Sequence, residues 1–272
     1  MEIDRRAFLA TLGGAAAIET MSAEALADAL EHHMMDELDQ AAQGATAQTA
    51  SPTDAPVPGA TARRGAGSLF VAQRDGAGAR ELRKLAPMPA RPTLVDFFNL
   101  RFAPANHVLQ SATRAMKTGM PEETILACLL HDVVLNLIKV DHGWWGAQLL
   151  EPYVSEKVSW GIRYHQALRF FPDPAAGYEY PELYNRIFGK DYVPEPHIHE
   201  AYKYARAHKW YMEARLITVN DLYAFDPNAK VSLDPFIDVI GRHFREPKEG
   251  LGYDNSPVAH MWRTIARPDM PL

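Results

Sequence analysis

Apolar residues recur at helical spacing along most of the chain, and this pattern predicts an all-α fold. No stretch shows the alternation of apolar and polar positions that a β-sheet requires. The pattern predicts helices over residues 94–101, 104–118, 141–150, 153–170, 198–224 and 234–244. A further helix is expected to open at Pro121-Glu122-Glu123 and to carry His131-Asp132. Residues 171–196 are rich in Pro and Tyr and are expected to form an irregular excursion from a helical bundle.

The region before residue 92 differs from the rest of the chain in its composition and in its expected order. Residues 22–39 carry apolar side chains at roughly helical spacing and predict one more helix. Residues 40–66 are rich in Ala, Gly, Thr, Pro and Ser, so they bury too little apolar surface to fold. The expected organisation is a signal-like and helical segment at 1–39, a flexible linker at 40–91, and a compact domain at 92–272. The N-terminal region is therefore expected to be disordered or extended.

The first residues resemble a twin-arginine export signal. Arg5-Arg6 is followed by Phe8-Leu9 and a Gly/Ala-rich stretch, and Ala25-Leu26-Ala27 matches a cleavage site. Glu19 ends a short apolar stretch, so an amphipathic N-terminal helix is the alternative. The first interpretation implies a periplasmic protein, and the second a cytoplasmic one.

The composition limits the kinds of partner and of metal ligand that the chain can use. The 272 residues are 47% hydrophobic and 23% charged, as in ordinary globular proteins. A net charge of -6 argues against a nucleic-acid partner, which would need a basic patch. No apolar run is long enough for a transmembrane helix. Cys128 is the only cysteine, so a metal site would have to use His, Asp and Glu. The sequence does not indicate an oligomeric state.

His131-Asp132 lies inside an apolar run, where an unpartnered charge would cost several kcal/mol. A metal ion would remove this cost, and further ligand-type residues surround the pair at His107, His142, His165 and Asp221. Asp132 and His142 would be roughly 15 Å apart on one straight helix, so a turn must separate them. Adjacent ligands can serve one centre if Asp132 bridges two metals. Four imidazoles and two carboxylates suit Fe, Mn, Zn or Ni.

Short motifs around these residues resemble the HD-domain superfamily, and more narrowly its mixed-valent di-iron oxygenase branch. This branch includes myo-inositol oxygenase and the phosphonate-degrading HD oxygenases. The resemblance covers residues 94–226 and is carried by His107-Val108-Leu109-Gln110-Ser111-Ala112, Leu129-Leu130-His131-Asp132, His142-Gly143-Trp144-Trp145-Gly146-Ala147, His165-Gln166-Ala167-Leu168-Arg169 and Asn220-Asp221-Leu222.

The resemblance implies an HD-type helical bundle with two iron ions. His107, His131, Asp132 and Asp221 would hold one iron, while Asp132, His142 and His165 would hold the other. Asp132 would bridge the two ions. The implied reaction uses dioxygen to oxidise a C–H bond of a small molecule.

Arg169 follows His165 by four residues and can pair bidentately with an anionic substrate. A surface arginine paired to a carboxylate is the equally weighted alternative. The phosphonate-degrading members carry a Tyr and a Glu where Phe97 and Leu100 stand here, which argues against an aminophosphonate substrate. The sequence hints only at a small molecule that is anionic or partly apolar.

Two other functions remain open at this point. A metal-dependent HD phosphohydrolase or phosphodiesterase would use the same ligands with Mn or Zn to activate water. A non-catalytic metal-binding protein that docks a partner through its N-terminal segment is the third interpretation. The Gln110 motif and the His142/His165 pair with Arg169 favour the oxygenase.

Overall fold

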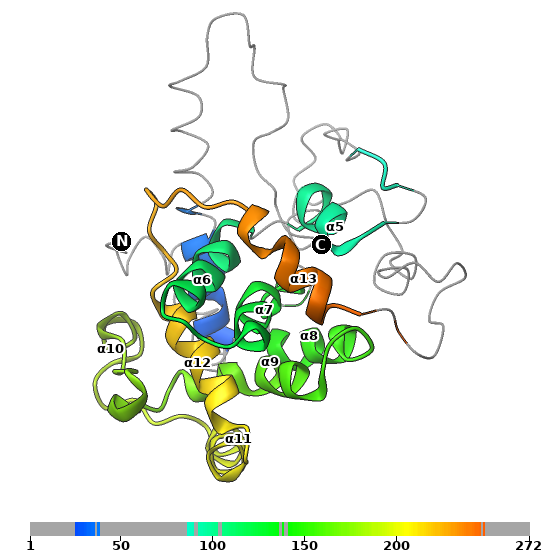
Figure 1. Cartoon of the computed structure of the whole chain (residues 1–272). Coiled ribbons are helices and arrows are strands. Elements are labelled where there is room, and N and C mark those ends of the chain that lie inside the picture. Colours follow the sequence, from blue (N-terminus) through cyan, green and yellow to red (C-terminus); the bar gives the residue numbers. More distant parts are fainter. Residues whose placement is uncertain are drawn as a thin grey trace, which may run out of the picture.

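The computed structural model describes residues 25–35, 37–38, 86–89, 92–102, 105–135, 138, 141–245 and 247. The predicted all-α fold is confirmed, since these residues contain helices and no strand (Figure 1). The α-helices labelled in Figure 1 are α5 Leu94–Leu100, α6 Ala105–Lys117, α7 Glu122–Leu130, α8 His142–Leu150, α9 Glu156–Leu168, α10 Glu182–Phe188, α11 Pro196–Ala207, α12 Tyr211–Leu222 and α13 Ile237–His243. Two 3-10 helices, η1 Pro174–Ala176 and η2 Asp234–Phe236, complete the order.

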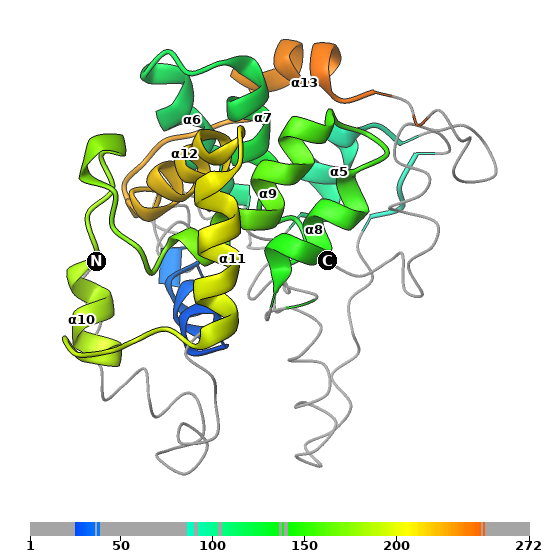
Figure 2. The same cartoon turned by 90° about the horizontal axis from the view of Figure 1, so that it is seen from below.

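Helix α9 lies at the centre of the bundle (Figure 2). It packs against α7, α8, α11 and α12, while α6 packs against α7 and α12. Helix α7 lies in the core between these helices, and every residue from Ile125 to Leu130 is apolar and buried. The end of such a helix therefore delivers the next residues of the chain directly into the interior.

Local sequence signals explain several helix ends. Thr93 and Asp96 form a reciprocal capping box that starts α5. Gly119, with a φ of 71°, ends the α6 turn in a left-handed conformation that suits glycine. Pro121 precedes α7, as expected, and Ser155 caps α9 by accepting a hydrogen bond from the Val158 N–H.

The predicted single helix at 198–224 is wrong, because the chain breaks into α11 and α12 at residues 208–210. His208 adopts an extended conformation with a ψ of 146°, and its Nδ1 accepts a hydrogen bond from the Trp210 N–H. The His208 ring also stacks on Trp160 of α9 at a centroid distance of 4.3 Å. These contacts depend on tertiary structure, so helical periodicity alone could not reveal the break.

The excursion at 171–196 is more ordered than expected, because it contains η1 and α10. Helix α10 lies at the edge of the molecule in both cartoons. Its Ile187 packs with Leu26 and Leu30 from the beginning of the chain. The excursion therefore contacts a segment that is more than 150 residues away in sequence.

The helix predicted at 22–39 is confirmed over residues 25–35 and 37–38, here called the N-terminal helix. It lies against the bundle and is blue in Figures 1 and 2. Ala27, part of the predicted cleavage site, is fully buried and packs with Phe170 and Ile198. The predicted export signal before residue 25 and nearly all of the predicted linker lie outside the described residues.

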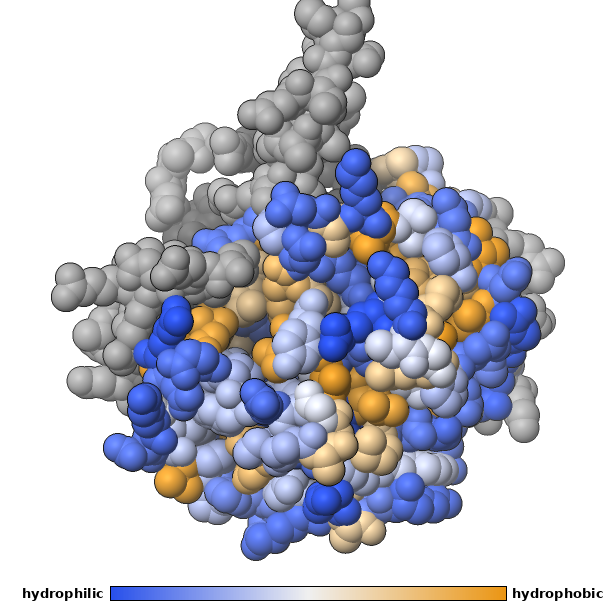
Figure 3. Space-filling view, turned by 60° about the vertical axis from the view of Figure 1, so that its left-hand side comes forward, coloured by the Kyte–Doolittle hydropathy of each residue, from blue (hydrophilic) through white to orange (hydrophobic). Residues whose placement is uncertain are grey.

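None of the described helices is both long and apolar enough to cross a bilayer. The face in Figure 3 mixes hydrophilic and hydrophobic residues without a continuous apolar area. Trp144 and Trp145 are 38% and 45% exposed on α8.

Candidate metal centre

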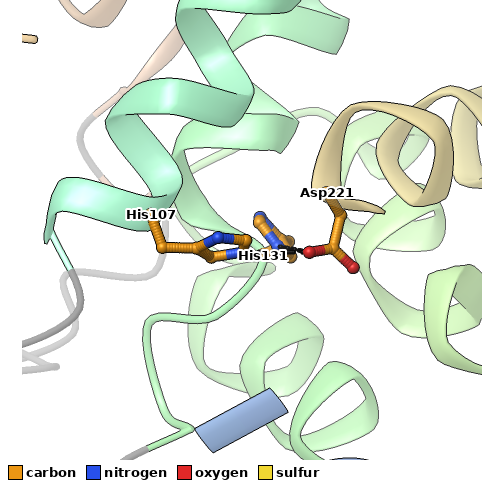
Figure 4. A group of neighbouring side chains, drawn as sticks. All are labelled: His107, His131 and Asp221. Carbon is orange, nitrogen blue, oxygen red and sulfur yellow. Dashed lines mark ion pairs between the residues drawn. The ribbon is translucent and has the colours of Figure 1, made fainter. Parts of the chain in front are cut away.

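The structure brings all six predicted ligands together in the interior, from five separate parts of the bundle. His107 lies on α6, His142 begins α8, His165 lies on α9 and Asp221 lies near the end of α12. The five other side chains are at most 2% exposed, and Asp221 is 9% exposed. Figure 4 shows His107 and Asp221 approaching His131 from opposite sides.

His131-Asp132 was expected to lie within a helix, but the pair lies in the turn that follows α7. Helix α7 ends at Leu130 and residues 131–135 form turns. The His131 Nδ1 lies 2.8 Å from the Cys128 carbonyl oxygen, which ties the first residue of the turn to the last turn of α7. The turn that must separate Asp132 from His142 is therefore present and begins at the pair itself.

Asp132 directs its two carboxylate oxygens toward different histidines. Its Oδ2 lies 3.4 Å from His107 Nε2 and 3.3 Å from His131 Nε2. Its Oδ1 lies 3.2 Å from His142 Nε2 and 3.9 Å from His165 Nε2. One carboxylate thus lies between two separate sets of ligand atoms.

Asp221 joins only the first of these sets. Its Oδ1 lies 2.9 Å from His107 Nε2 and 3.7 Å from His131 Nε2 (Figure 4). The first set therefore contains two imidazoles and two carboxylates. The second set contains two imidazoles and the shared Asp132.

These distances suit metal ions. Two ligand atoms that each bind one ion at about 2.1 Å lie at most about 4.2 Å apart. The His–Asp separations within the two sets fall between 2.9 and 3.9 Å. Within the described part of the chain, no hydrogen bond satisfies the buried His107, His131 and His165 Nε2 atoms, Asp221 Oδ1 or either Asp132 oxygen. Buried polar atoms normally have a partner, and bound cations would supply one here.

Backbone carbonyls orient three of the histidines. The Nδ1 atoms of His107, His131 and His165 lie 3.1, 2.8 and 2.6 Å from the carbonyl oxygens of Ala224, Cys128 and Ile162. An Nδ1–H that donates to a carbonyl leaves Nε2 as the unprotonated metal-binding atom. The ring orientations required for metal binding are thus set by the backbone.

Gln166 and Gly143 position the fourth histidine. The Gln166 amide nitrogen lies 3.0 Å from His142 Nδ1, while its Oε1 accepts a 2.6 Å hydrogen bond from the Gly143 N–H. A Cβ on Gly143 would lie 2.8 Å from the Ile162 carbonyl oxygen and 3.0 Å from the His165 ring. Only glycine permits this close approach of α8 to α9, which brings His142 and His165 to the same site.

The electrostatics of the site also favour cations. Although burial disfavours the imidazolium, the carboxylates of Asp132 and Asp221 raise the pKa of His107 to about 9. Burial is likewise outweighed at His142, where Asp132, Asp28 and Glu31 raise the pKa to about 9. At His165, burial and the charges of His131 and His142 lower the pKa to about 3. The buried carboxylates thus attract positive charge, which metal ions can supply in place of protons.

Arg169 has a different environment from either expectation. It is the residue after α9 and is only 4% exposed, so it is not a surface arginine. Its guanidinium donates hydrogen bonds to two carboxylates of the N-terminal helix, Asp28 and Glu31. The pairing with carboxylates was anticipated, but its buried position and its partners were not.

Sequence reasoning missed Asp28, Glu31 and Arg215. Asp28 interrupts the apolar run from Ala25 to Leu30, which is a shorter form of the signal that singled out His131-Asp132, whereas Glu31 begins a polar stretch and has no such signal. Arg215 is fully buried and donates to the Leu168 and Phe171 carbonyls at 3.0 and 2.9 Å. It thereby holds the end of α9 beside the site, and no local motif marks it.

Comparison with known proteins gives one relationship and no family assignment. No family model matches the chain. A segment of 94 residues is 32% identical to the 1-hydroxy-2-(trimethylamino)ethylphosphonate dioxygenase (glycine-betaine-forming) of Leisingera caerulea. The chain is a homologue of a phosphonate dioxygenase. This relationship supports the resemblance to the oxygenase branch that the motifs indicated.

The match is partial in both proteins. It covers 30% of this chain and 46% of the relative, so the chain spans less than half the length of that dioxygenase. Phe97, at a position linked to substrate recognition in the resemblance, is fully buried and stacks on Phe102 in the core. The relationship therefore supports an oxygenase in general terms and leaves the substrate open.

Proposed function

We propose that the protein is a non-haem di-iron oxygenase that uses dioxygen to oxidise a C–H bond of a small substrate. The observation that carries this proposal is the division of the Asp132 carboxylate between two sets of ligand atoms. Such a carboxylate is suited to bridge two ions. The homologous phosphonate dioxygenase favours redox chemistry over hydrolysis at this centre.

The residues divide into two metal sites. His107, His131, Asp132 and Asp221 would hold the first iron, and Asp132, His142 and His165 the second. When bound, the iron pair would transfer electrons from the oxidised substrate to dioxygen. The first site has four protein ligands and the second has three, so the second has more room for substrate and dioxygen.

The protein itself orients the ligands and excludes water. Carbonyl groups fix His107, His131 and His165, and Gln166 fixes His142. The buried ligand set keeps bulk water from the reacting centre, which limits side reactions. Arg169 is the candidate for binding an anionic group of the substrate, which would replace Asp28 on its guanidinium.

Metal analysis and oxygen uptake test the proposal together. Protein purified without chelator should contain about two irons per chain and should consume dioxygen with a member of a panel of small phosphonates, polyols and carboxylates. Asp132→Asn should lose both iron and oxygen uptake. The Glu37→Gln variant, altered at a half-exposed residue of the N-terminal helix, should retain both.

A phosphohydrolase is the competing outcome of the same experiment. Zinc or manganese alone in the purified protein, with phosphate release from phosphoesters that Asp132→Asn abolishes, would replace the oxygenase by a hydrolase. An unchanged metal content in both Asp132→Ala and His165→Ala would mean that the ligand set is wrong.

A further inference from the structure

The N-terminal helix places two carboxylates beside the metal centre. Asp28 and Glu31 are three residues apart, so they lie on the same face of the helix. Asp28 is fully buried and Glu31 is 7% exposed. Two acids are rarely buried in this way unless charged partners surround them.

One oxygen of Asp28 contacts residues that position others, while its Oδ2 has no hydrogen-bond partner among the described residues. Its Oδ1 accepts hydrogen bonds from Arg169 Nη2 and, at 3.0 Å, from Gln166 Nε2. Gln166 in turn contacts His142, as described above. Asp28 therefore supports the second metal site from outside, and its contacts point toward α9.

Glu31 points into the site instead. Its Oε2 accepts a hydrogen bond from Arg169 Nη1 at 3.1 Å and lies 4.0 Å from His142 Nε2. A carboxylate oxygen of Glu31 also lies within 4.8 Å of ligand atoms of His107 and Asp132. The 4.0 Å separation is below the limit of about 4.2 Å for two ligands of one ion.

The second metal site has space for such a ligand. It has three protein ligands in the proposed set, whereas the first has four. The buried His165 Nε2 and Asp132 Oδ1 atoms of this site have no hydrogen-bond partner among the described residues. Glu31 approaches the same site from the N-terminal helix, a different part of the fold from all other ligands.

We infer that Glu31 is a further ligand of the second metal, supplied by the N-terminal helix. Arg169 is a positioning residue that holds the Glu31 carboxylate, and Asp28 holds Arg169. This inference rests on the two-metal centre of the proposed function. It makes the N-terminal helix a source of one ligand of the metal centre.

Binding of Mn²⁺ to metal-free protein tests the inference without any enzymatic assay. Isothermal titration calorimetry should find two Mn²⁺ ions in the wild type. In Glu31→Gln, which has the same size and lacks the charge, the affinity for one of the two ions should fall at least about tenfold. Glu37→Gln removes a charge from the same helix at a side chain that is 40% exposed, and both affinities should stay unchanged.

Water proton relaxation in the Mn²⁺-loaded proteins separates a ligand from a neighbouring charge. Removing a ligand opens a coordination position to water, so Glu31→Gln should show higher relaxivity than the wild type. Glu37→Gln removes a charge from the same helix at an exposed side chain and should leave the relaxivity at the wild-type level. If Glu31→Gln does not fold, Glu31→Asp takes its place, since its carboxylate is one methylene too short to bind the metal.

The outcomes are distinguishable. Two Mn²⁺ ions in the wild type, with equal affinities and relaxivity in Glu31→Gln, would overturn the role of Glu31 and leave the two-metal centre intact. A single Mn²⁺ ion in the wild type would overturn the two-metal centre, and the Glu31 assignment with it.

Discussion

Substitution of Gly143 by Ala tests whether the close approach of α8 to α9 builds the second metal site. The new Cβ would lie 2.8 Å from the Ile162 carbonyl oxygen, 2.9 Å from Gln166 Oε1 and 3.0 Å from the His165 ring. The first gap must widen by about 0.6 Å to reach an ordinary contact of 3.4 Å. Because one obstacle is backbone, α8 itself has to move.

The substitution should lower both the free energy of unfolding and the affinity for the second ion. Overpacking of this kind costs about 1–3 kcal/mol in the free energy of unfolding. His142 precedes Gly143 and moves with it, and metal sites tolerate displacements of only about 0.2 Å in ligand distance. The affinity for the second ion should therefore fall about 10–100-fold, while the first ion, held from α6, α12 and the turn after α7, stays bound.

Gly146→Ala is the matched control on the same helix. Its added Cβ would find the nearest atoms at 3.6 and 3.7 Å, which are ordinary contacts. The better helix propensity of alanine should make this variant equal to the wild type or about 0.5–1 kcal/mol more stable. Urea unfolding of metal-free protein and Mn²⁺ calorimetry measure both quantities. Equal behaviour of the two variants would refute the role assigned to Gly143.

Two further predictions concern protonation and a buried arginine. Carboxylates outweigh burial and raise the pKa values of His107 and His142 to about 9, so both side chains are imidazolium ions at pH 7 in metal-free protein. Mn²⁺ binding should therefore release protons, and the affinity for Mn²⁺ should fall as the pH falls below 9. Calorimetry in buffers of different ionisation enthalpy measures this release, and a buffer-independent enthalpy would contradict it. Arg215→Met should lower the free energy of unfolding by about 2–4 kcal/mol, because the Leu168 and Phe171 carbonyls and the Tyr211 hydroxyl lose their donor. Urea unfolding measures this change, and a loss below about 1 kcal/mol would count against the role of Arg215.

The helical fold and the ligand series could be predicted from sequence because both depend on local patterns. Apolar spacing located most helices, and the charged pair in the run from Ile125 to Leu135 located the centre. The structure brings His107, His142, His165 and Asp221 around that pair. Their role as metal ligands stays a prediction.

The remaining features depend on contacts between distant residues. The break at His208 follows from stacking on Trp160, and periodicity continues through it. The end of α7 before His131 shifts the pair into a turn that the apolar run conceals. Arg169 was associated with a substrate anion because its buried partners, Asp28 and Glu31, precede it by about 140 residues. The division of the chain near residue 92 stays a prediction.

The spin coupling of the two irons tests the role of Asp132 most directly. A carboxylate that bridges Fe(II) and Fe(III) couples their spins, so iron-loaded wild-type protein after partial oxidation should give the electron paramagnetic resonance signal of a coupled pair. Asp132→Asn should lose this signal, whereas Glu37→Gln should keep it. A spectrum of isolated Fe(III) alone in the wild type, at two irons per chain, would contradict a centre bridged by Asp132.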